Sequence, residues 1–282
     1  MRFIRKISLL GFITIGLISC DQPSEAKSES EEVEEKLSNS GEAMISKSIA
    51  PSGVIDEKEG LKLVALEEES DFPNASLELN TRTESLKSGK NTLQFSVEGY
   101  ELAKQTEDQR STLLANSKKG QHVHFILNNG PYEAHYDEEF EIQLDEGHNV
   151  ILAFLSRSYH ESVKEETAFV FKDVVIGEEL EDFDKSAPCL IYSRPKGSYT
   201  LSESDRILVD FYLLNAKLSS SDMKVELTVD DTVFMLSNWQ PYWVEGLKAG
   251  EHKFRLRLLD EEGNLVQGPF NDSGIRLVKI EE

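Results

Sequence analysis

The stretch 140–158, FEIQLDEGHNVILAFLSRS, decides the fold because it predicts two consecutive strands around a glycine turn. Phe140, Ile142 and Leu144 alternate with polar residues, which is the period of a strand with one buried face. After Gly147 the apolar residues continue without polar interruption to the end of the second strand. The segment has the turn residues and the strand lengths of an antiparallel β-protein.

Strand-like patterns recur along the chain. The segments 61–65, 91–102 and 122–127 alternate in the same way, and turn residues separate them at short intervals. No long stretch carries the 3.6-residue stripe of an amphipathic helix, and only the polar connection 103–120 leaves room for a short one. The pattern therefore predicts an all-β protein built as a sandwich.

The second half of the chain repeats the first. The stretch 242–263, YWVEGLKAGEHKFRLRLLDEEG, resembles the opening stretch, and the pair Leu144 and Gly147 matches Leu247 and Gly250 at a constant offset. Each copy is about a hundred residues long, the usual size of an immunoglobulin-like domain. We expect two tandem immunoglobulin-like or fibronectin-like β-sandwich domains after a disordered acidic tether. The predicted boundaries are 61–178 for the first sandwich, 179–186 for a linker and 187–282 for the second sandwich.

The first nineteen residues predict a signal peptide. A basic start is followed by the short apolar segment 7–18, which is too short for a comfortable membrane span. Residues 17–20, Leu-Ile-Ser-Cys, resemble a bacterial lipobox, and that resemblance implies cleavage before Cys20 and acylation of its side chain. The expected location is the bacterial cell envelope, lipid-anchored, either periplasmic or surface-exposed. A plain secretory signal and an uncleaved N-terminal anchor are the alternatives.

Residues 20–60 carry the lipidated cysteine and an acidic segment rich in Ser, Glu and Lys. Such a composition buries too little apolar surface to offset the entropy of ordering, so a flexible tether is expected. The whole chain has a formal net charge of −22, which disfavours nucleic acid and anionic lipid surfaces as partners. Of the two cysteines only Cys189 remains after Cys20, and its apolar neighbours predict a buried, inert thiol.

The two copies differ on one strand face. In 253–258 of the second copy, Lys253, Arg255 and Arg257 alternate with apolar residues, which predicts one solvated face. The matching strand of the first copy, 149–155, is apolar on both faces and should therefore be covered on both. Its outer positions would lie beside the histidines of 122–127. The predicted binding or scaffolding patch consists of His122, His124, Leu152, Phe154, Arg157, Tyr159 and His160, and the alternative is that the two sandwiches pack there.

Histidines suggest a metal site within this patch. His122 and His124 are two residues apart, so a strand sends both imidazoles to one face. Zinc or copper could take both, with His160 as the third ligand. His148 and His252 occupy similar turns in the two copies, which favours a structural role for both. A pair of imidazoles without a defined third ligand is also compatible with ordinary packing.

Two further groups are candidate binding residues. Trp239, Tyr242 and Trp243, and on another segment Tyr132 and Tyr136, could form an aromatic platform for a carbohydrate or a peptide. A sandwich usually buries a tryptophan, so at least one Trp is expected in the core.

Two arginines, Arg157 and Arg194, could grip a carboxylate or phosphate, although pairing with a local Asp or Glu is the alternative in so acidic a chain. The sequence contains none of the common hydrolase, metalloprotease or phosphate-loop motifs, so a non-catalytic protein is expected. No cofactor is expected, and zinc or copper at the histidines is the alternative.

The segments 120–140, 146–164, 192–199 and 238–247 resemble a family of uncharacterised lipoproteins from Bacteroidota, some of which are labelled phosphopeptide-binding. The resemblance implies two immunoglobulin-like repeats and an envelope location. It carries no established site onto residues of this chain. The expected partners are the membrane, through the N-terminal lipid, and an envelope protein or glycan.

Overall fold

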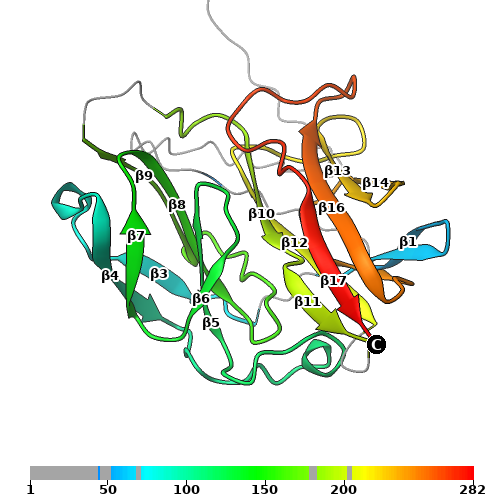
Figure 1. Ribbon diagram of the computed structural model, residues 1–282, viewed down its shortest axis with the longest axis horizontal. Coiled ribbons are helices and arrows are strands. Elements are labelled where there is room, and N and C mark those ends of the chain that lie inside the picture. Colours follow the sequence, from blue (N-terminus) through cyan, green and yellow to red (C-terminus); the bar gives the residue numbers. More distant parts are fainter. Residues whose placement is uncertain (1–43, 45–51, 68–70, 178–182, 202–204) are drawn as a thin grey trace, which may run out of the picture. The chain divides into compact units, whose positions relative to one another are not determined.

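The computed structural model describes residues 44, 52–67, 71–177, 183–201 and 205–282. The described part contains seventeen strands and two short 3-10 helices, η1 (Thr83–Ser85) and η2 (Arg110–Thr112), so the prediction of an all-β fold is confirmed (Figure 1). The predicted signal peptide, Cys20 and most of the predicted tether lie outside the described residues.

The first sandwich consists of a three-stranded and a four-stranded sheet. Their inner faces enclose one apolar core, in which Leu93, Phe95, Val123, Phe125 and Ile151 are almost fully buried. The three-stranded sheet has the order β3 (Ser76–Leu79), β4 (Gly89–Glu98), β7 (Glu139–Leu144), and the four-stranded sheet has the order β6 (Glu133–His135), β5 (His122–Leu127), β8 (Gly147–Ser156), β9 (Phe169–Ile176).

The second sandwich consists of two five-stranded sheets. Val209 and Phe211 of one sheet and Leu227, Phe254 and Leu256 of the other are buried in its core. One sheet has the order β1 (Gly53–Lys58), β2 (Leu61–Ala65), β15 (Tyr242–Glu245), β12 (Arg206–Leu214), β10 (Cys189–Arg194). The other has the order β11 (Gly197–Thr200), β17 (Arg276–Glu281), β16 (Gly250–Leu259), β13 (Lys224–Val229), β14 (Thr232–Leu236).

The N-terminal hairpin β1–β2 belongs to the second sandwich, which corrects the predicted boundary at residue 61. Strand β2 pairs antiparallel with β15, with Leu63 opposite Val244. Strand β1 also replaces the last residues of the predicted tether. The alternation of Leu61, Leu63 and Ala65 predicts that one face of the strand is buried, but it does not say in which sandwich. The strand pairs with the edge of β15, and its apolar side chains join the cluster that includes the core of the second sandwich.

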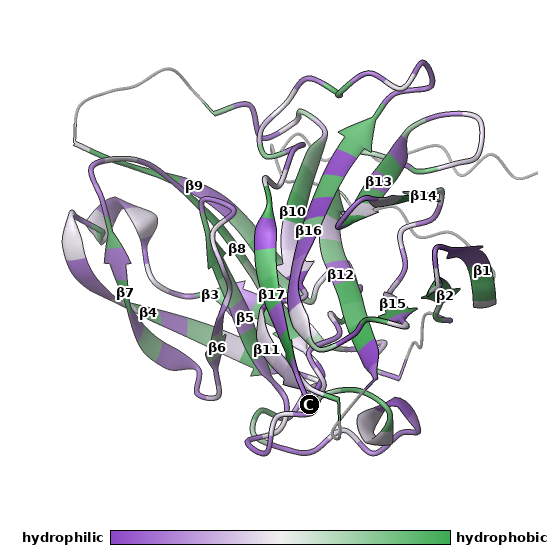
Figure 2. Ribbon diagram, turned by 45° about the vertical axis from the view of Figure 1, so that its right-hand side comes forward, coloured by the Kyte–Doolittle hydropathy of each residue, from purple (hydrophilic) through white to green (hydrophobic). Residues whose placement is uncertain are grey.

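Strands β10 and β12 are buried on both faces of their sheet. Val209 and Phe211 face the core of the second sandwich, whereas Tyr212 contacts Phe154 and Phe169 of the first, with ring centroids 4.7 and 5.4 Å apart. The apolar residues of β10 and β12 can be followed along the ribbon in Figure 2. A buried ion pair, Lys164 Nζ to Asp210 Oδ1 at 2.6 Å, crosses the same contact. The first sandwich is therefore covered where the sequence left its outer face apolar.

Candidate metal centre

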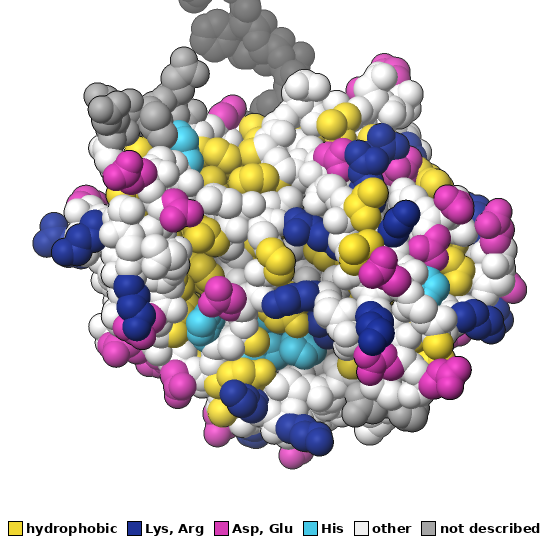
Figure 3. All heavy atoms as spheres, in the orientation of Figure 1, with side chains coloured by type: hydrophobic (Ala, Val, Ile, Leu, Met, Phe, Trp, Pro, Cys, Tyr) yellow, Lys and Arg dark blue, Asp and Glu magenta, His cyan; other side chains and the backbone are white. Residues whose placement is uncertain are grey.

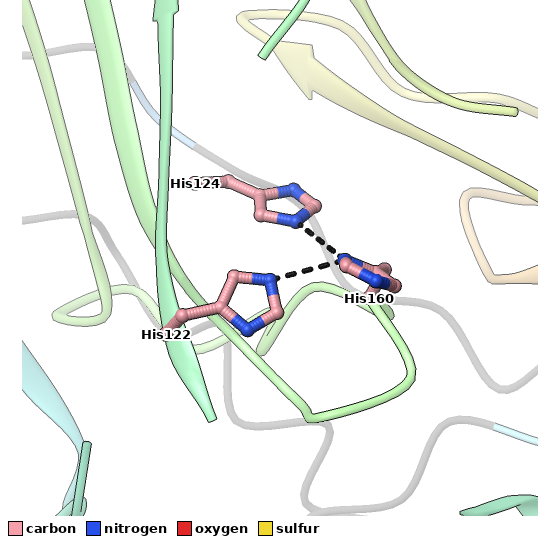
Figure 4. A group of neighbouring side chains, drawn as sticks. All are labelled: His122, His124 and His160. Atoms are coloured by element: carbon pink, nitrogen blue, oxygen red, sulfur yellow. Dashed lines mark hydrogen bonds between the residues drawn. The ribbon is translucent and has the colours of Figure 1, made fainter. Parts of the chain in front are cut away.

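Three imidazoles meet at the edge of the contact between the sandwiches. Strand β5 supplies His122 and His124, and the loop after β8 supplies His160. His160 Nδ1 lies 3.1 Å from His122 Nε2 and 3.3 Å from His124 Nε2 (Figure 4). One ligand nitrogen from each ring lies within 4.8 Å of the other two. The structure thus brings together the three residues that the sequence proposed as metal ligands.

The loop that carries His160 is held by buried charges. Backbone hydrogen bonds from His160 N to Arg157 O and from Arg157 N to Glu161 O close a tight turn, with His160 at φ 74°. Glu161 is 2% exposed, and its carboxylate accepts two hydrogen bonds from Arg110 Nη1, each 2.9 Å long. A non-glycine residue in the left-handed region costs free energy and persists only where its surroundings fix it. Here the buried ion pairs fix the turn, and the turn aims His160 at β5.

Second contacts orient the two rings on β5. His122 Nδ1 lies 2.8 Å from Gly120 O, so this nitrogen is assigned as the N–H donor and Nε2 is left with its lone pair toward His160. The ring of Tyr132 stacks on His124, with centroids 3.8 Å apart and planes inclined by 14°. On the other side, His124 Nδ1 lies 3.3 Å from Ser193 Oγ of the second sandwich. Both ring planes are therefore fixed before any ligand binds.

Burial keeps these imidazoles neutral. It lowers the pKa of His122 to about 4, and Arg194 adds to the effect. Burial also lowers the pKa of His124 and of His160, and the neighbouring imidazoles and Arg194 lower both further. The neutral imidazole is the form that binds a metal ion, so no proton has to be displaced at neutral pH.

Two of the three separations between the ligand nitrogens match the spacing around a tetrahedral metal ion, and the third is no more than 4.8 Å. A single Nδ1–H of His160 can donate to only one of the two facing nitrogens, so one close contact would remain unsatisfied. Metal–nitrogen bonds of about 2.0–2.1 Å around a tetrahedral ion place the ligand atoms roughly 3.3 Å apart. The separations of 3.1 and 3.3 Å fit that spacing. Imidazole nitrogens suit zinc and copper, which are the ions that the sequence suggested.

The centre reaches the surface through one residue. His122 and His124 are fully buried, whereas His160 is partly exposed. Figure 3 shows histidine side chains reaching the surface close to basic side chains on the face drawn. His160 is therefore the member of the centre closest to solvent.

Four residues of the predicted binding patch are buried and not available to a partner, and at Leu152 and Phe154 the alternative holds, that the two sandwiches pack there. Leu152 and Phe154 are 0% exposed and lie in the apolar cluster shared with the second sandwich. Arg157 and Tyr159 are buried within the loop, where Tyr159 Oη donates to Asp108 Oδ2 at 2.7 Å. The second sandwich covers this apolar face because removing apolar surface from water is favourable.

The predicted aromatic platform is also corrected. Trp239 is 3% exposed; its Nε1 donates to Phe211 O at 2.8 Å, and its ring lies against Tyr212 at the contact between the sandwiches, with centroids 5.4 Å apart. Tyr242 is 1% exposed and donates to Asn238 O. Trp243 is half-buried against a small apolar cluster that includes Tyr159. The three rings point to different surroundings and form no common stacking surface.

The other sequence candidates have structural surroundings. His148 Nδ1 lies 2.7 Å from Asp173 Oδ2, and His252 Nδ1 lies 2.7 Å from Asp230 Oδ2, so both turn histidines pair with an aspartate as their matching positions suggested. His135 stacks on Phe140 with ring centroids 3.5 Å apart. Cys189 is a free, buried cysteine, and burial raises the pKa of its thiol to about 12.

The sequence did not place Tyr132, Ser193 and Arg194 beside the histidines. Tyr132 Oη accepts a hydrogen bond of 2.7 Å from Arg194 Nη1 and lies 3.4 Å from His160 Nδ1. Tyr132 was visible as a candidate aromatic and Arg194 as a candidate anion grip. Neither signal says that two segments about sixty residues apart meet at one point, and Ser193 carries no signal of its own.

No protein-family model matches this sequence, and a search of curated proteins finds no match. Among solved structures, the fibronectin(III)-like modules of Clostridium thermocellum CbhA are 11% identical over 73% of this chain and 93% of theirs, with a TM-score of 0.24. The central fibronectin-III array of RIM-binding protein is 10% identical over 76% of this chain and 71% of its own, also with a TM-score of 0.24. The extracellular domain of a putative hybrid two component system from B. thetaiotaomicron is 8% identical over 82% of this chain and 44% of its own, with a TM-score of 0.26. In the part of the chain that the structure describes, no helix is long and apolar enough to span a membrane.

Proposed function

We propose that this protein is a lipid-anchored envelope protein that binds one zinc or copper ion through His122, His124 and His160. The observation that carries the proposal is the convergence of three imidazole nitrogens, two of them fully buried, at 3.1 and 3.3 Å around His160 Nδ1. Neutral imidazoles from a rigid strand and a braced loop are a prepared ligand set. The envelope location rests on the sequence of residues 1–20.

The role that we propose is non-catalytic binding of the ion, for sensing, storage or delivery. The centre joins the two sandwiches, because His124 contacts Ser193 and Tyr132 contacts Arg194. An ion bound there would stabilise the folded arrangement by mass action, by roughly 2.7 kcal/mol at a hundredfold excess over Kd. A tether of the predicted kind would hold this unit away from the membrane to which Cys20 anchors it.

Calorimetric titration of the purified full chain with Zn2+ and Cu2+ tests the proposal. We expect one ion per chain in the parent and no stoichiometric binding in the double variant His122→Ala/His124→Ala. The matched control is His148→Ala/His252→Ala, which removes the same number of imidazoles from the two aspartate-paired turns. The control should bind like the parent. Absence of binding in the parent, or equal loss in both double variants, would contradict the proposal.

A further inference from the structure

A fourth donor atom lies beside the three imidazoles. Tyr132 Oη is 3.4 Å from His160 Nδ1, next to the separations of 3.1 and 3.3 Å to the nitrogens of His122 and His124. Three donor atoms from three different residues therefore surround one nitrogen at nearly equal distances. The edges of a tetrahedron around a zinc or copper ion are roughly 3.3 Å long. The oxygen therefore lies within ligand spacing of His160 Nδ1, one of the three candidate ligand atoms.

Tyr132 is held in this position from several sides. Its side chain is 7% exposed, and its ring stacks on His124 with centroids 3.8 Å apart. The ammonium group of Lys196 lies over the Tyr132 ring, 4.4 Å from its centroid, and donates a hydrogen bond to the Tyr132 backbone carbonyl. A ring that is packed on both a ligand and a second-sandwich loop has little rotational freedom, so its oxygen is presented at a fixed place.

Arg194 supplies the independent observation. It is 4% exposed, its Nη1 donates to Tyr132 Oη at 2.7 Å, and it forms a salt bridge with none of the carboxylates in the described ranges. The Nε–H of Arg194 is buried without a hydrogen-bond partner. A buried guanidinium without an anion is unfavourable, and the chain has acidic residues in excess that could have paired with it. Arg194 thus lacks a carboxylate partner and donates to the Tyr132 oxygen, which would supply the missing negative charge if it were a phenolate.

We propose that the phenolic oxygen of Tyr132 is the fourth donor of the centre, which completes a set of three nitrogens and one oxygen, and that Arg194 is a positioning residue for that oxygen. This inference rests on the proposed function. On binding, a metal–oxygen bond forms, the phenol proton leaves to solvent, and the oxidation state of the ion does not change. The phenolate and Arg194 then form a charge-assisted hydrogen bond. An anionic oxygen without any sulfur in the set favours Cu2+ and Zn2+ over Cu+.

The experiment loads the purified full chain with Cu2+ and records its visible absorption and resonance Raman spectra. We expect a phenolate-to-Cu2+ charge-transfer band and phenolate vibrations in the parent. Tyr132→Phe keeps the ring that stacks on His124 and removes only the oxygen, so it should still bind one Cu2+ without the band, at an affinity at least about tenfold lower. The matched control is Tyr136→Phe, because Tyr136 also lies beside the centre, with its ring centroid 5.0 Å from that of His122.

Each outcome decides. A band that persists in Tyr132→Phe, or a parent that binds Cu2+ without a band or phenolate vibrations, overturns the assignment of Tyr132 and leaves the three-histidine site intact. A parent that binds no metal overturns both the assignment and the proposed function. Arg194→Gln should shift or weaken the band while one Cu2+ still binds, and Arg194→Lys should restore part of it. If Tyr132→Phe misfolds, phenolate vibrations that appear in the parent and persist in Tyr136→Phe still assign the phenolate to Tyr132, because they exclude the other tyrosine beside the centre.

Discussion

The two sandwiches carry the same pair of strands with opposite outer faces. In the first, His124 of β5 lies opposite Phe154 of β8, and their rings are 5.1 Å apart by centroid. In the second, the matching positions are Glu226 of β13 and Arg257 of β16, which form an ion pair of 2.7 Å. Phe154 is 0% exposed, whereas the Arg257 side chain is 34% exposed. One backbone arrangement thus supports a covered face and a solvated one.

The difference shows that the backbone geometry of a β-sandwich strand does not determine whether its outward side chains are apolar or charged. Inward positions are apolar in both copies, because both cores exclude water. The outward positions follow whatever lies against them, which is the β10–β12 sheet in one copy and solvent in the other. Covering the first face also brings the end of β10 close to one of the histidines, because Ser193 Oγ lies 3.3 Å from His124 Nδ1. The three imidazoles of the candidate metal centre all come from the first copy, and the contact adds Ser193 and Arg194 beside them.

Exchanging the outward residues of β8 and β16 gives the largest expected effect. Phe154→Arg places in the first copy the residue that its counterpart carries, and it buries a charge without a partner next to Tyr212. We expect the free energy of unfolding to fall by about 5 kcal/mol or more. The reciprocal Arg257→Phe should change it by no more than about 1 kcal/mol. Urea denaturation of both variants measures the difference, and similar losses in the two would contradict the comparison.

The sequence predicted those parts of the molecule that depend on neighbours along the chain. Alternation and the repeat gave an all-β fold in two copies, and the His-x-His spacing on one strand gave two of the three metal-ligand candidates. The features that the sequence could not predict depend on contacts between segments far apart along the chain. Strand β2 pairs with β15 some 180 residues later, and Tyr132 meets Arg194, because edges and loops are completed by whichever segment folding brings there.

The surroundings of the aromatic residues could not be predicted from the sequence either. Trp239 and Trp243 stand four residues apart and look like one platform in the sequence, yet Trp239 packs against Tyr212 in the large apolar cluster and Trp243 packs against a separate cluster that contains Tyr159. Composition states that a tryptophan will be buried or will bind. It does not state which, because both outcomes remove the same apolar surface from water.

The buried ion pair across the contact gives the next largest effect. Asp210→Ala leaves the Lys164 ammonium, which is 1% exposed, without its carboxylate at 2.6 Å. Loss of one partner of a buried pair costs about 3–5 kcal/mol, so the midpoint of urea denaturation should fall clearly. The double variant Lys164→Met/Asp210→Leu removes both charges and should recover most of the loss. A double variant as unstable as Asp210→Ala would show that the pair contributes specific contacts beyond charge balance.

The histidines give the two copies opposite responses to acid in the metal-free protein. Burial lowers the pKa of His122 to about 4 from the 6.5 of an unfolded chain, so between these values the unfolded state binds more protons. The free energy of unfolding should therefore fall as the pH drops from 6.5 to 4, by about 3 kcal/mol for His122, and His124 and His160 act in the same direction.

His252 in the second copy has the opposite sign. Burial lowers its pKa, but hydrogen bonds with Asp230 and Lys248 O raise it more, so its contribution is present below 6.5 and is lost as the pH rises through its folded pKa. Denaturation midpoints at pH 7, 6 and 5 measure both. His122→Gln should flatten the decline and His252→Gln should steepen it slightly, and the same slope in both variants would refute the assignment.

The smallest expected effect concerns the solvated face and its dependence on salt. Arg255 Nε donates to Asp272 Oδ1 at 2.8 Å, with the two side chains 39% and 28% exposed. An ion pair this exposed contributes about 0.2–1 kcal/mol, so Arg255→Gln should lower the unfolding free energy by no more than that at low ionic strength. In 1 M NaCl the screening length is about 3 Å, and the difference between parent and Arg255→Gln should vanish. The loss in Asp210→Ala should persist at the same salt concentration, because the pair that it breaks is out of reach of the ions. If salt removed both losses alike, the face of the first copy would be solvated after all, and the distinction between the two copies would fail.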